Sequence, residues 1–145
     1  MEKMITQLNE FLSDLEIFNV KLQNYHWNVT GKGFFVTHEK LEKYYDEIRE
    51  QIDEIAEHIL ALGGQPLGTL KDYLQFTKIA EAENKKVDCS TVFNSIITDY
   101  STLLEKAICI KKQADTEEEY KTSAIMDNLI ENYTKKLWIL KQSME

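Results

Sequence analysis

The chain has 145 residues and a net charge of −8 at pH 7, so it fits one domain spanning residues 1–145, and its charge opposes nucleic acid and attracts cations. One proline, five glycines and apolar residues at helical intervals favour an all-α fold over a sheet. There is no apolar run of about 18 residues and no charged-then-apolar leader, which argues against a membrane span or secretory signal and predicts a soluble, cytoplasmic protein.

Apolar residues three or four apart predict the first helix, from Ile5 to near Asn28. Its stripe consists of Leu8, Phe11, Leu12, Leu15, Phe18, Leu22 and Tyr25. The glycine-containing segment 30–33 breaks the pattern. A second stripe from Leu41 to Leu62 then predicts a helix that stops at residues 63–64, where two glycines precede a proline.

Residues 63 to about 89 form a long connection with one short helical candidate, Leu70 to Phe76. A third stripe begins at Val92 and breaks around residue 115. Two short connections and one long one predict a ferritin-like four-helix bundle, in which a long crossover between the second and third helices carries a short extra helix.

The last helix is predicted from its start signal and its own apolar stripe. Thr116 and Glu119 have the spacing of a capping box, which predicts a helix start at this point. Apolar residues from Tyr120 to Leu140 then continue at helical spacing. On the third helix, Cys109 and the earlier Cys89 lack CxxC spacing, so free, partly buried thiols are expected.

Histidines and carboxylates form the most informative pattern. His26 and His38 flank the first turn, which brings them together, and Asp53 and Glu57 are four residues apart on one helical face, as suits a single cation. At roughly 100° per residue, His38 and the two carboxylates share a stripe away from the apolar one. A metal inside the bundle would need the other stripe, typically with a Glu-x-x-His motif, which is absent.

Distance places the predicted site between chains. His38 and Asp53 are 15 residues apart, or about 22 Å along one helix, so one ion cannot contact both within a chain. Two copies of this helix packed antiparallel about a two-fold axis near Tyr45 and Asp46 would place His38 of one copy beside Asp53 and Glu57 of the other. Such a dimer has two equivalent sites.

Each of these residues also has a simpler interpretation. His26 shares the apolar stripe of the first helix, so it is also consistent with a hydrogen-bonded core histidine, and His38 with a solvated first-turn residue. Asp53 and Glu57 fit an ordinary solvated acidic face. His58 lies about 100° beyond Glu57 and is expected at the surface or in support of the ligands.

Five motifs resemble the Dps proteins, or miniferritins, over essentially the whole chain: NYHWNV at 24–29, FFVTH at 34–38, YYDEI at 44–48, DEIAEH at 53–58 and ALGGQP at 61–66. The resemblance implies that His26, His38, Asp53 and Glu57 are the metal ligands at a two-fold interface. It further implies a homo-oligomer of twelve subunits, a dodecamer. Such a ferroxidase oxidises Fe(II) with hydrogen peroxide or dioxygen and stores ferric mineral in its cavity, which protects against oxidative stress.

Other roles follow only from the resemblance. Trp27 would intercept stray radicals at the catalytic site; its alternative is an ordinary buried aromatic. Mineral growth would begin at Glu39, Glu42 and Asp46, unless these belong to a solvated charged face. An iron entry pore would be lined by Asp115, Glu117, Glu118, Glu119 and Asp127. A position on the last helix that is often aspartate in relatives is Ala124, which puts the entry path in doubt.

Two further function classes stay open. One is a structural or signalling helical oligomer whose site is vestigial or holds zinc in place of iron. The other is a DNA-compacting protein that oxidises iron incidentally. Segments 1–4 and 141–145 are not the lysine-rich tails through which some Dps proteins bind DNA, so weak or absent DNA binding is expected at physiological salt.

Overall fold

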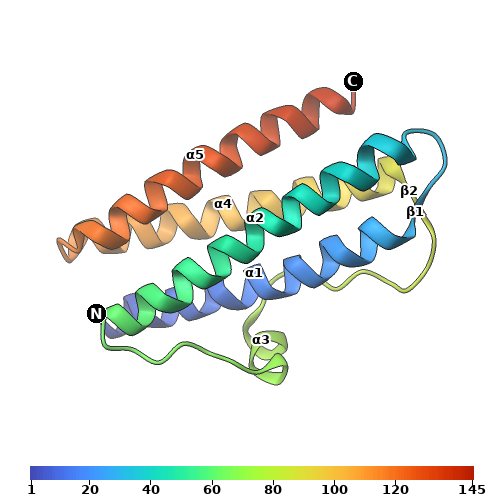
Figure 1. The fold of residues 1–145 in the computed structure, drawn as a ribbon. Coiled ribbons are helices and arrows are strands. Elements are labelled where there is room, and N and C mark those ends of the chain that lie inside the picture. Colours follow the sequence, from blue (N-terminus) through green and yellow to red (C-terminus); the bar gives the residue numbers. More distant parts are fainter.

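The computed structural model describes residues 1–145 as a four-helix bundle with one short extra helix (Figure 1). The elements are α1 (Glu2–Asn28), β1 (Val29–Thr30), α2 (Phe34–Ala61), α3 (Leu70–Phe76), β2 (Val87–Asp88), α4 (Cys89–Thr116) and α5 (Tyr120–Ser143). Helix α1 packs along α2, α4 packs along α5, and α1 also contacts α4. The predicted all-α, ferritin-like architecture is confirmed, including the bounds of the short helix.

The core forms where the four apolar stripes meet. Phe18 of α1 contacts Tyr100 of α4 edge-on, with ring centroids 4.9 Å apart, and Tyr100 lies 5.8 Å from Tyr133 of α5. The hydroxyl of Tyr133 donates to Gln51 Oε1 at 2.6 Å, which ties α5 to α2. Because the stripes predicted from the sequence supply these buried residues, the core side of α2 is fixed and its opposite side faces outward.

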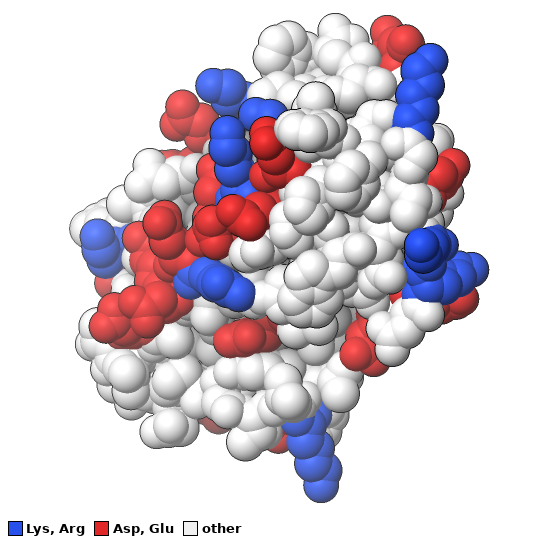
Figure 2. Space-filling model, turned by 45° about the vertical axis from the view of Figure 1, so that its right-hand side comes forward, with Lys and Arg blue, Asp and Glu red and all other residues white.

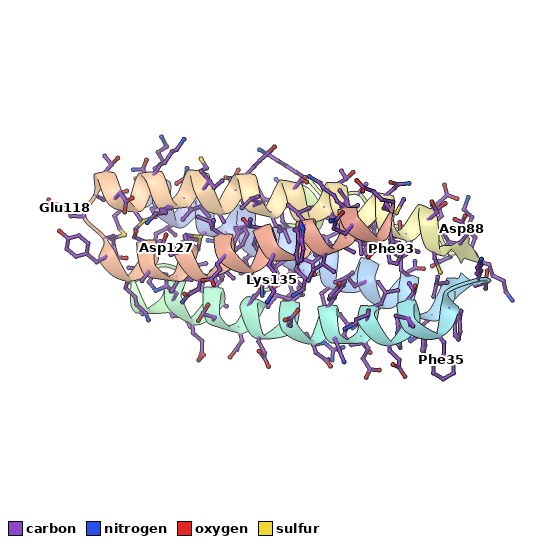
Figure 3. The ribbon with its side chains drawn as sticks, turned by 90° about the horizontal axis from the view of Figure 1, so that it is seen from above. Phe35, Asp88, Phe93, Glu118, Asp127 and Lys135 are labelled. Carbon is purple, nitrogen blue, oxygen red and sulfur yellow. The ribbon has the colours of Figure 1, made fainter.

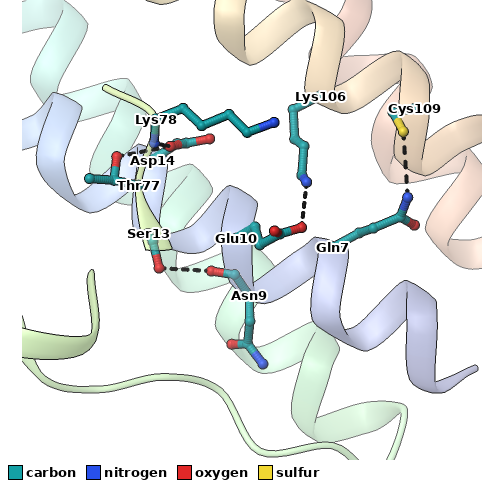
Figure 4. Close-up of polar contacts among 9 residues, drawn as sticks. All are labelled: Gln7, Asn9, Glu10, Ser13, Asp14, Thr77, Lys78, Lys106 and Cys109. Atoms are coloured by element: carbon teal, nitrogen blue, oxygen red, sulfur yellow. Dashed lines mark hydrogen bonds and ion pairs between the residues drawn. The ribbon is translucent and has the colours of Figure 1, made fainter. Parts of the chain in front are cut away.

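The long crossover is attached to α1 by a buried carboxylate (Figure 4). Asp14 Oδ1 accepts hydrogen bonds from the Thr77 hydroxyl at 2.8 Å and from the Lys78 backbone N–H at 2.7 Å. Burial raises the pKa of Asp14, while these two bonds and the charge of Lys106 oppose that rise. The crossover therefore follows a defined path back along the bundle rather than hanging free.

Two very short strands were not predicted. Val29–Thr30 of β1 pair in parallel with Val87–Asp88 of β2. The pairing joins the α1–α2 turn to the end of the crossover, immediately before α4. This bridge fixes the turn that separates the two histidines.

The capping box predicted at Thr116 and Glu119 is wrong. Thr116 is the last residue of α4, and its hydroxyl donates to the Lys112 carbonyl at 2.9 Å. Glu119 itself caps α5, because its carboxylate accepts from the Thr122 backbone N–H at 2.7 Å and from the Thr122 hydroxyl. A single-turn reversal, with Glu118 at a φ of 55°, replaces the predicted arrangement.

The side-chain view from above shows the two ends of the bundle (Figure 3). Phe35 projects away from the helices at the end where Asp88 lies, and Glu118 lies at the opposite end. Acidic side chains gather in a band on the face shown in Figure 2, with basic ones among them. None of the helices combines the length and apolar character needed to cross a membrane.

Candidate metal centre

His26 and His38 meet across the α1–α2 turn, as the sequence predicted. Their rings are stacked, with centroids 3.8 Å apart and planes inclined by 10°. His26 Nδ1 lies 2.6 Å from the His38 carbonyl oxygen, and His38 Nδ1 lies 2.7 Å from the His26 carbonyl oxygen. The ring of each histidine is therefore held by the main-chain carbonyl of the other.

This reciprocal pairing defines which nitrogen of each ring is free. A carbonyl oxygen only accepts hydrogen bonds, so each Nδ1 carries the hydrogen, and in the neutral ring each Nε2 keeps a lone pair. Metal-binding histidines commonly donate their second ring N–H to a carbonyl in this way, which fixes the tautomer and ring orientation. In each imidazole, Nε2 is thus the nitrogen that could bind a metal ion.

Burial differs between the two rings. His26 is only 7% exposed, and His38 is half-buried. The interpretation of His26 as a buried, hydrogen-bonded residue is therefore correct, and it is compatible with a ligand role because the bonded atom is Nδ1. The solvated first-turn interpretation of His38 is wrong.

Glu42 is a neighbour of this pair that sequence reasoning did not place in the site. Its Oε1 lies 3.7 Å from His26 Nε2. Two ligands that each lie about 2.1 Å from one ion are separated by about 3–4 Å, so this gap matches joint coordination. The signal was present in the sequence, because Glu42 follows His38 by four residues and shares its helical face.

Aromatic rings surround the histidines. Phe34 stacks on His38, with centroids 5.0 Å apart, and Tyr45 meets His26 edge-on at 5.5 Å. Desolvation is the largest cause of the raised pKa of the Tyr45 phenol, and the negative charges of Glu42 and Asp46 add to it. The pair therefore lies in a partly apolar setting with a carboxylate at its edge.

Asp53 and Glu57 lie farther along α2, with both side chains exposed. Together with Glu50, Glu54 and His58, and with Lys121 and Ile125 of α5, they line an open hollow. The prediction that these carboxylates leave the core face is confirmed by their exposure, and the half-buried His38 is likewise outside the buried core. Within one chain, no three His, Cys, Asp or Glu side chains are grouped so as to hold a metal ion.

His58 is buried, at 7% exposed, so of its two predicted positions the surface one is wrong, and the position in support of the ligands stays open. Its Nε2 lies 2.6 Å from Thr122 Oγ1, and the Thr122 hydroxyl donates to Glu119. Burial lowers the pKa of His58, and the nearby Glu119 carboxylate partly offsets that shift. The chain of contacts from α2 to α5 supports the helix directly behind Glu57.

Trp27 is 70% exposed, so the alternative of an ordinary buried aromatic is wrong. The nucleation candidates Glu39, Glu42 and Asp46 are also exposed, as either of their two interpretations requires. Of the two free thiols, Cys89 is half-buried as expected, whereas Cys109 is exposed.

The acidic group predicted to line an entry path is largely engaged in local contacts. Asp127 lies 3.0 Å from Lys111 Nζ, and Asp115 lies 3.7 Å from the same amine. Glu117 pairs with the amino group of Met1, and Glu119 caps α5. Ala124, the position that put the entry path in doubt, is exposed.

Known proteins with this fold are similar along the full chain. Residues 5–145 match the family described as a ferritin-like domain. A Bacillus anthracis protein named "DNA protection during starvation protein 2" is 36% identical over 143 residues, which cover 97% of this chain and 95% of that protein.

Solved structures extend the similarity to three dimensions. A Dps protein from Vibrio cholerae O1, described as a member of a superfamily of ferritin-like diiron-carboxylate proteins, superposes with a TM-score of 0.96 at 30% identity, over 99% of this chain and 90% of that one. A zinc-soaked Dps from Listeria innocua gives a TM-score of 0.93 at 28% identity, over 97% and 95% of the two chains.

Proposed function

The chain belongs to the Dps group of the ferritin-like family, whose general role is iron storage and protection, and on this premise we propose that it is a ferroxidase whose active site is shared between two subunits. Fe(II) is the substrate. Histidines 26 and 38 with Glu42 of one subunit, and Asp53 with Glu57 of the other, form the site. Hydrogen peroxide or dioxygen is the electron acceptor.

The reciprocal pairing of His26 and His38 is the observation that carries this proposal. It leaves the Nε2 atom of each imidazole outside these bonds, and His26 Nε2 lies 3.7 Å from the Glu42 carboxylate. Imidazole and carboxylate ligands suit Fe(II), and thiolates, which would favour a different metal chemistry, are absent from this ligand set. The donor atoms therefore fit iron as a substrate.

The exposed carboxylates of α2 support sharing of the site. Asp53 and Glu57 point away from the bundle core, and no element of the same chain supplies them with a histidine other than His58, whose Nε2 is held by Thr122. Antiparallel packing of two α2 helices would place these carboxylates opposite His26 and His38 of the second chain. The same two-fold symmetry generates two sites in each dimer.

The residues act by binding and orientation. The histidines and carboxylates hold two Fe(II) ions close together, so that each gives one electron to the same peroxide molecule. The two electrons and two protons cleave the oxygen–oxygen bond and form two waters, which avoids release of a hydroxyl radical. The exposed indole of Trp27 lies next in sequence to His26, where it would reduce any radical that escapes.

Storage requires a closed assembly. We expect the dimers to form a dodecamer whose cavity receives the ferric product. Glu39 and Asp46 would begin mineral growth if their face of α2 lines that cavity. Zinc, which also accepts imidazole and carboxylate ligands, is expected to compete with iron at the site.

Oxidation by a double variant tests the proposal. Fe(II) is added anaerobically to the wild-type protein and to Asp53→Ala/Glu57→Ala, peroxide follows, and ferric absorbance is recorded. Loss of both carboxylates should slow oxidation by on the order of 100-fold, at or beyond the usual effect of perturbing a metal site. Glu131→Ala, an exposed change on α5, is the matched control and should oxidise iron as the wild type does. Equal rates for wild type and double variant would refute the site assignment.

A further inference from the structure

Phe34 is the aromatic residue nearest to the histidine pair that is not itself a candidate ligand. Its ring stacks on the His38 imidazole, with centroids 5.0 Å apart and planes inclined by 22°. The other ring stacked on His38 is that of His26, at 3.8 Å. Two rings parallel to His38 at these distances would overlap if they shared one face, so His38 lies between Phe34 and His26.

The backbone conformation of the α1–α2 turn fixes the position of Phe34. Phe34 is the first residue of α2, and its N–H donates to the Gly31 carbonyl at 3.1 Å. Gly33, directly before it, has a φ of 87°, a conformation that residues with a Cβ rarely adopt. The turn therefore fixes the start of α2 at Phe34, whose ring lies over His38 while 38% of the residue stays exposed.

The next residue provides an internal comparison. Phe35 is 77% exposed and projects away from the bundle (Figure 3), and it stacks on no other ring within the chain. Phe34, at 38% exposed, has most of its surface covered. Two adjacent phenylalanines thus differ in whether they touch the histidine pair.

We propose that Phe34 is a positioning residue that holds the His38 imidazole in its metal-binding orientation. His38 has one hydrogen bond, from Nδ1 to the His26 carbonyl, and a single bond leaves the ring free to tilt about that contact. Rings packed on both faces remove this freedom, so less orientational entropy is lost when Nε2 binds a metal. The inference rests on the metal site proposed above.

Cobalt(II) binding tests the proposal without turnover, because its visible absorption reports ligand number and geometry. Phe34→Ala should raise the Co(II) dissociation constant about two- to ten-fold, the range expected for loss of one aromatic stack, and should change the Co(II) spectrum. In Fe(II) oxidation the same variant should raise KM more than it lowers kcat. Phe35→Ala, the matched control, should bind Co(II) as the wild type does, with the mass of both assemblies checked by sedimentation.

Two further variants separate stacking from simple space filling. Phe34→Tyr keeps the ring and should restore wild-type affinity and spectrum, whereas Phe34→Leu fills similar space without a planar face and should resemble Phe34→Ala. Unchanged Co(II) affinity and spectrum in Phe34→Ala would overturn the inference, as would full rescue by leucine.

Failure of the proposed function gives a different pattern. If Asp53→Ala/Glu57→Ala bound Co(II) as tightly as the wild type, the shared site itself would be wrong, and with it the basis for Phe34. If that double variant lost affinity while Phe34→Ala did not, only the role of Phe34 would be refuted.

Discussion

The two ends of α2 hold the two halves of the proposed site in different states. At the N-terminal end, His38 is bonded to His26 and stacked between rings, and His26 lies close to Glu42. At the C-terminal end, Asp53 and Glu57 are exposed, and their carboxylates make no hydrogen bond or ion pair within the chain. The histidine half is preorganised, and the carboxylate half is open.

The support behind each half explains this difference. The α1–α2 turn and the short β1–β2 pairing hold the histidine half from one side. In the carboxylate half, the contact between His58 and Thr122 holds α2 against α5 on the core side. This contact does not involve the outward-facing carboxylates of Asp53 and Glu57. A half-site that is rigid but open at its ligands is what a second subunit can complete.

The largest expected difference between the two halves is in how much a substitution lowers the free energy of unfolding. His26→Ala removes a buried ring and leaves the His38 carbonyl without its donor, so it should lower the free energy of unfolding by about 1–3 kcal/mol. Asp53→Ala removes an exposed side chain and should change it by less than about 0.5 kcal/mol. Denaturant unfolding at one fixed protein concentration measures both, because assembly makes stability concentration-dependent.

One outcome of this experiment would contradict the difference between the two halves of the site. A loss at Asp53→Ala as large as that at His26→Ala would mean that the carboxylate half is also fixed within its own chain. Asn128→Ala, another exposed helical change, supplies the baseline for a residue outside the site.

A smaller effect is expected at the support behind the carboxylates. Glu119→Ala removes the cap of α5 and should cost about 1 kcal/mol at neutral pH. Hydrogen bonds from Thr122 hold the pKa of Glu119 below its ordinary value. A carboxylate with a lowered folded-state pKa contributes stability above its unfolded pKa and loses it as the pH falls through the folded one.

The pH dependence sharpens this test. The stability difference between wild type and Glu119→Ala should be constant near neutral pH and shrink as the pH falls below about 4.5, where the free carboxyl begins to protonate. Denaturant unfolding from pH 7 to pH 3 measures it, with Glu131→Ala as control. A difference that grew in acid would contradict the capping role.

Much of the fold could be predicted because local signals agreed with the tertiary structure. The apolar stripes, the breaker at 30–33 and the short helix Leu70–Phe76 all depend on spacing and turn chemistry. The capping prediction at Thr116 failed because the spacing of a hydroxyl and a carboxylate does not reveal which of them has the cap geometry. The β1–β2 pairing was missed because two-residue strands have no periodicity.

The site was predictable in outline for a similar reason. Helical rotation placed His38, Asp53 and Glu57 off the core correctly, since rotation depends only on residue spacing. Glu42 was assigned to the charged face because its distance to His26 depends on how α1 packs against α2. For His58, the rotation of α2 left both a surface position and a supporting one open, because its burial comes from contacts with α5 that this rotation does not describe.

Complementation between two inactive chains tests the shared site most directly. One chain carries His26→Ala/His38→Ala, the other Asp53→Ala/Glu57→Ala, and the two are co-expressed with different tags so that mixed assemblies are isolated. In a mixed dimer, the histidines of the second chain and the carboxylates of the first would form one intact site out of two.

Random mixing makes half of the dimers mixed, so about one quarter of the wild-type sites should return. We therefore predict that each variant alone is inactive in peroxide-driven Fe(II) oxidation and that the mixed assemblies recover about a quarter of the wild-type rate. Mixed assemblies that remain as inactive as the parent variants would contradict a site shared between subunits.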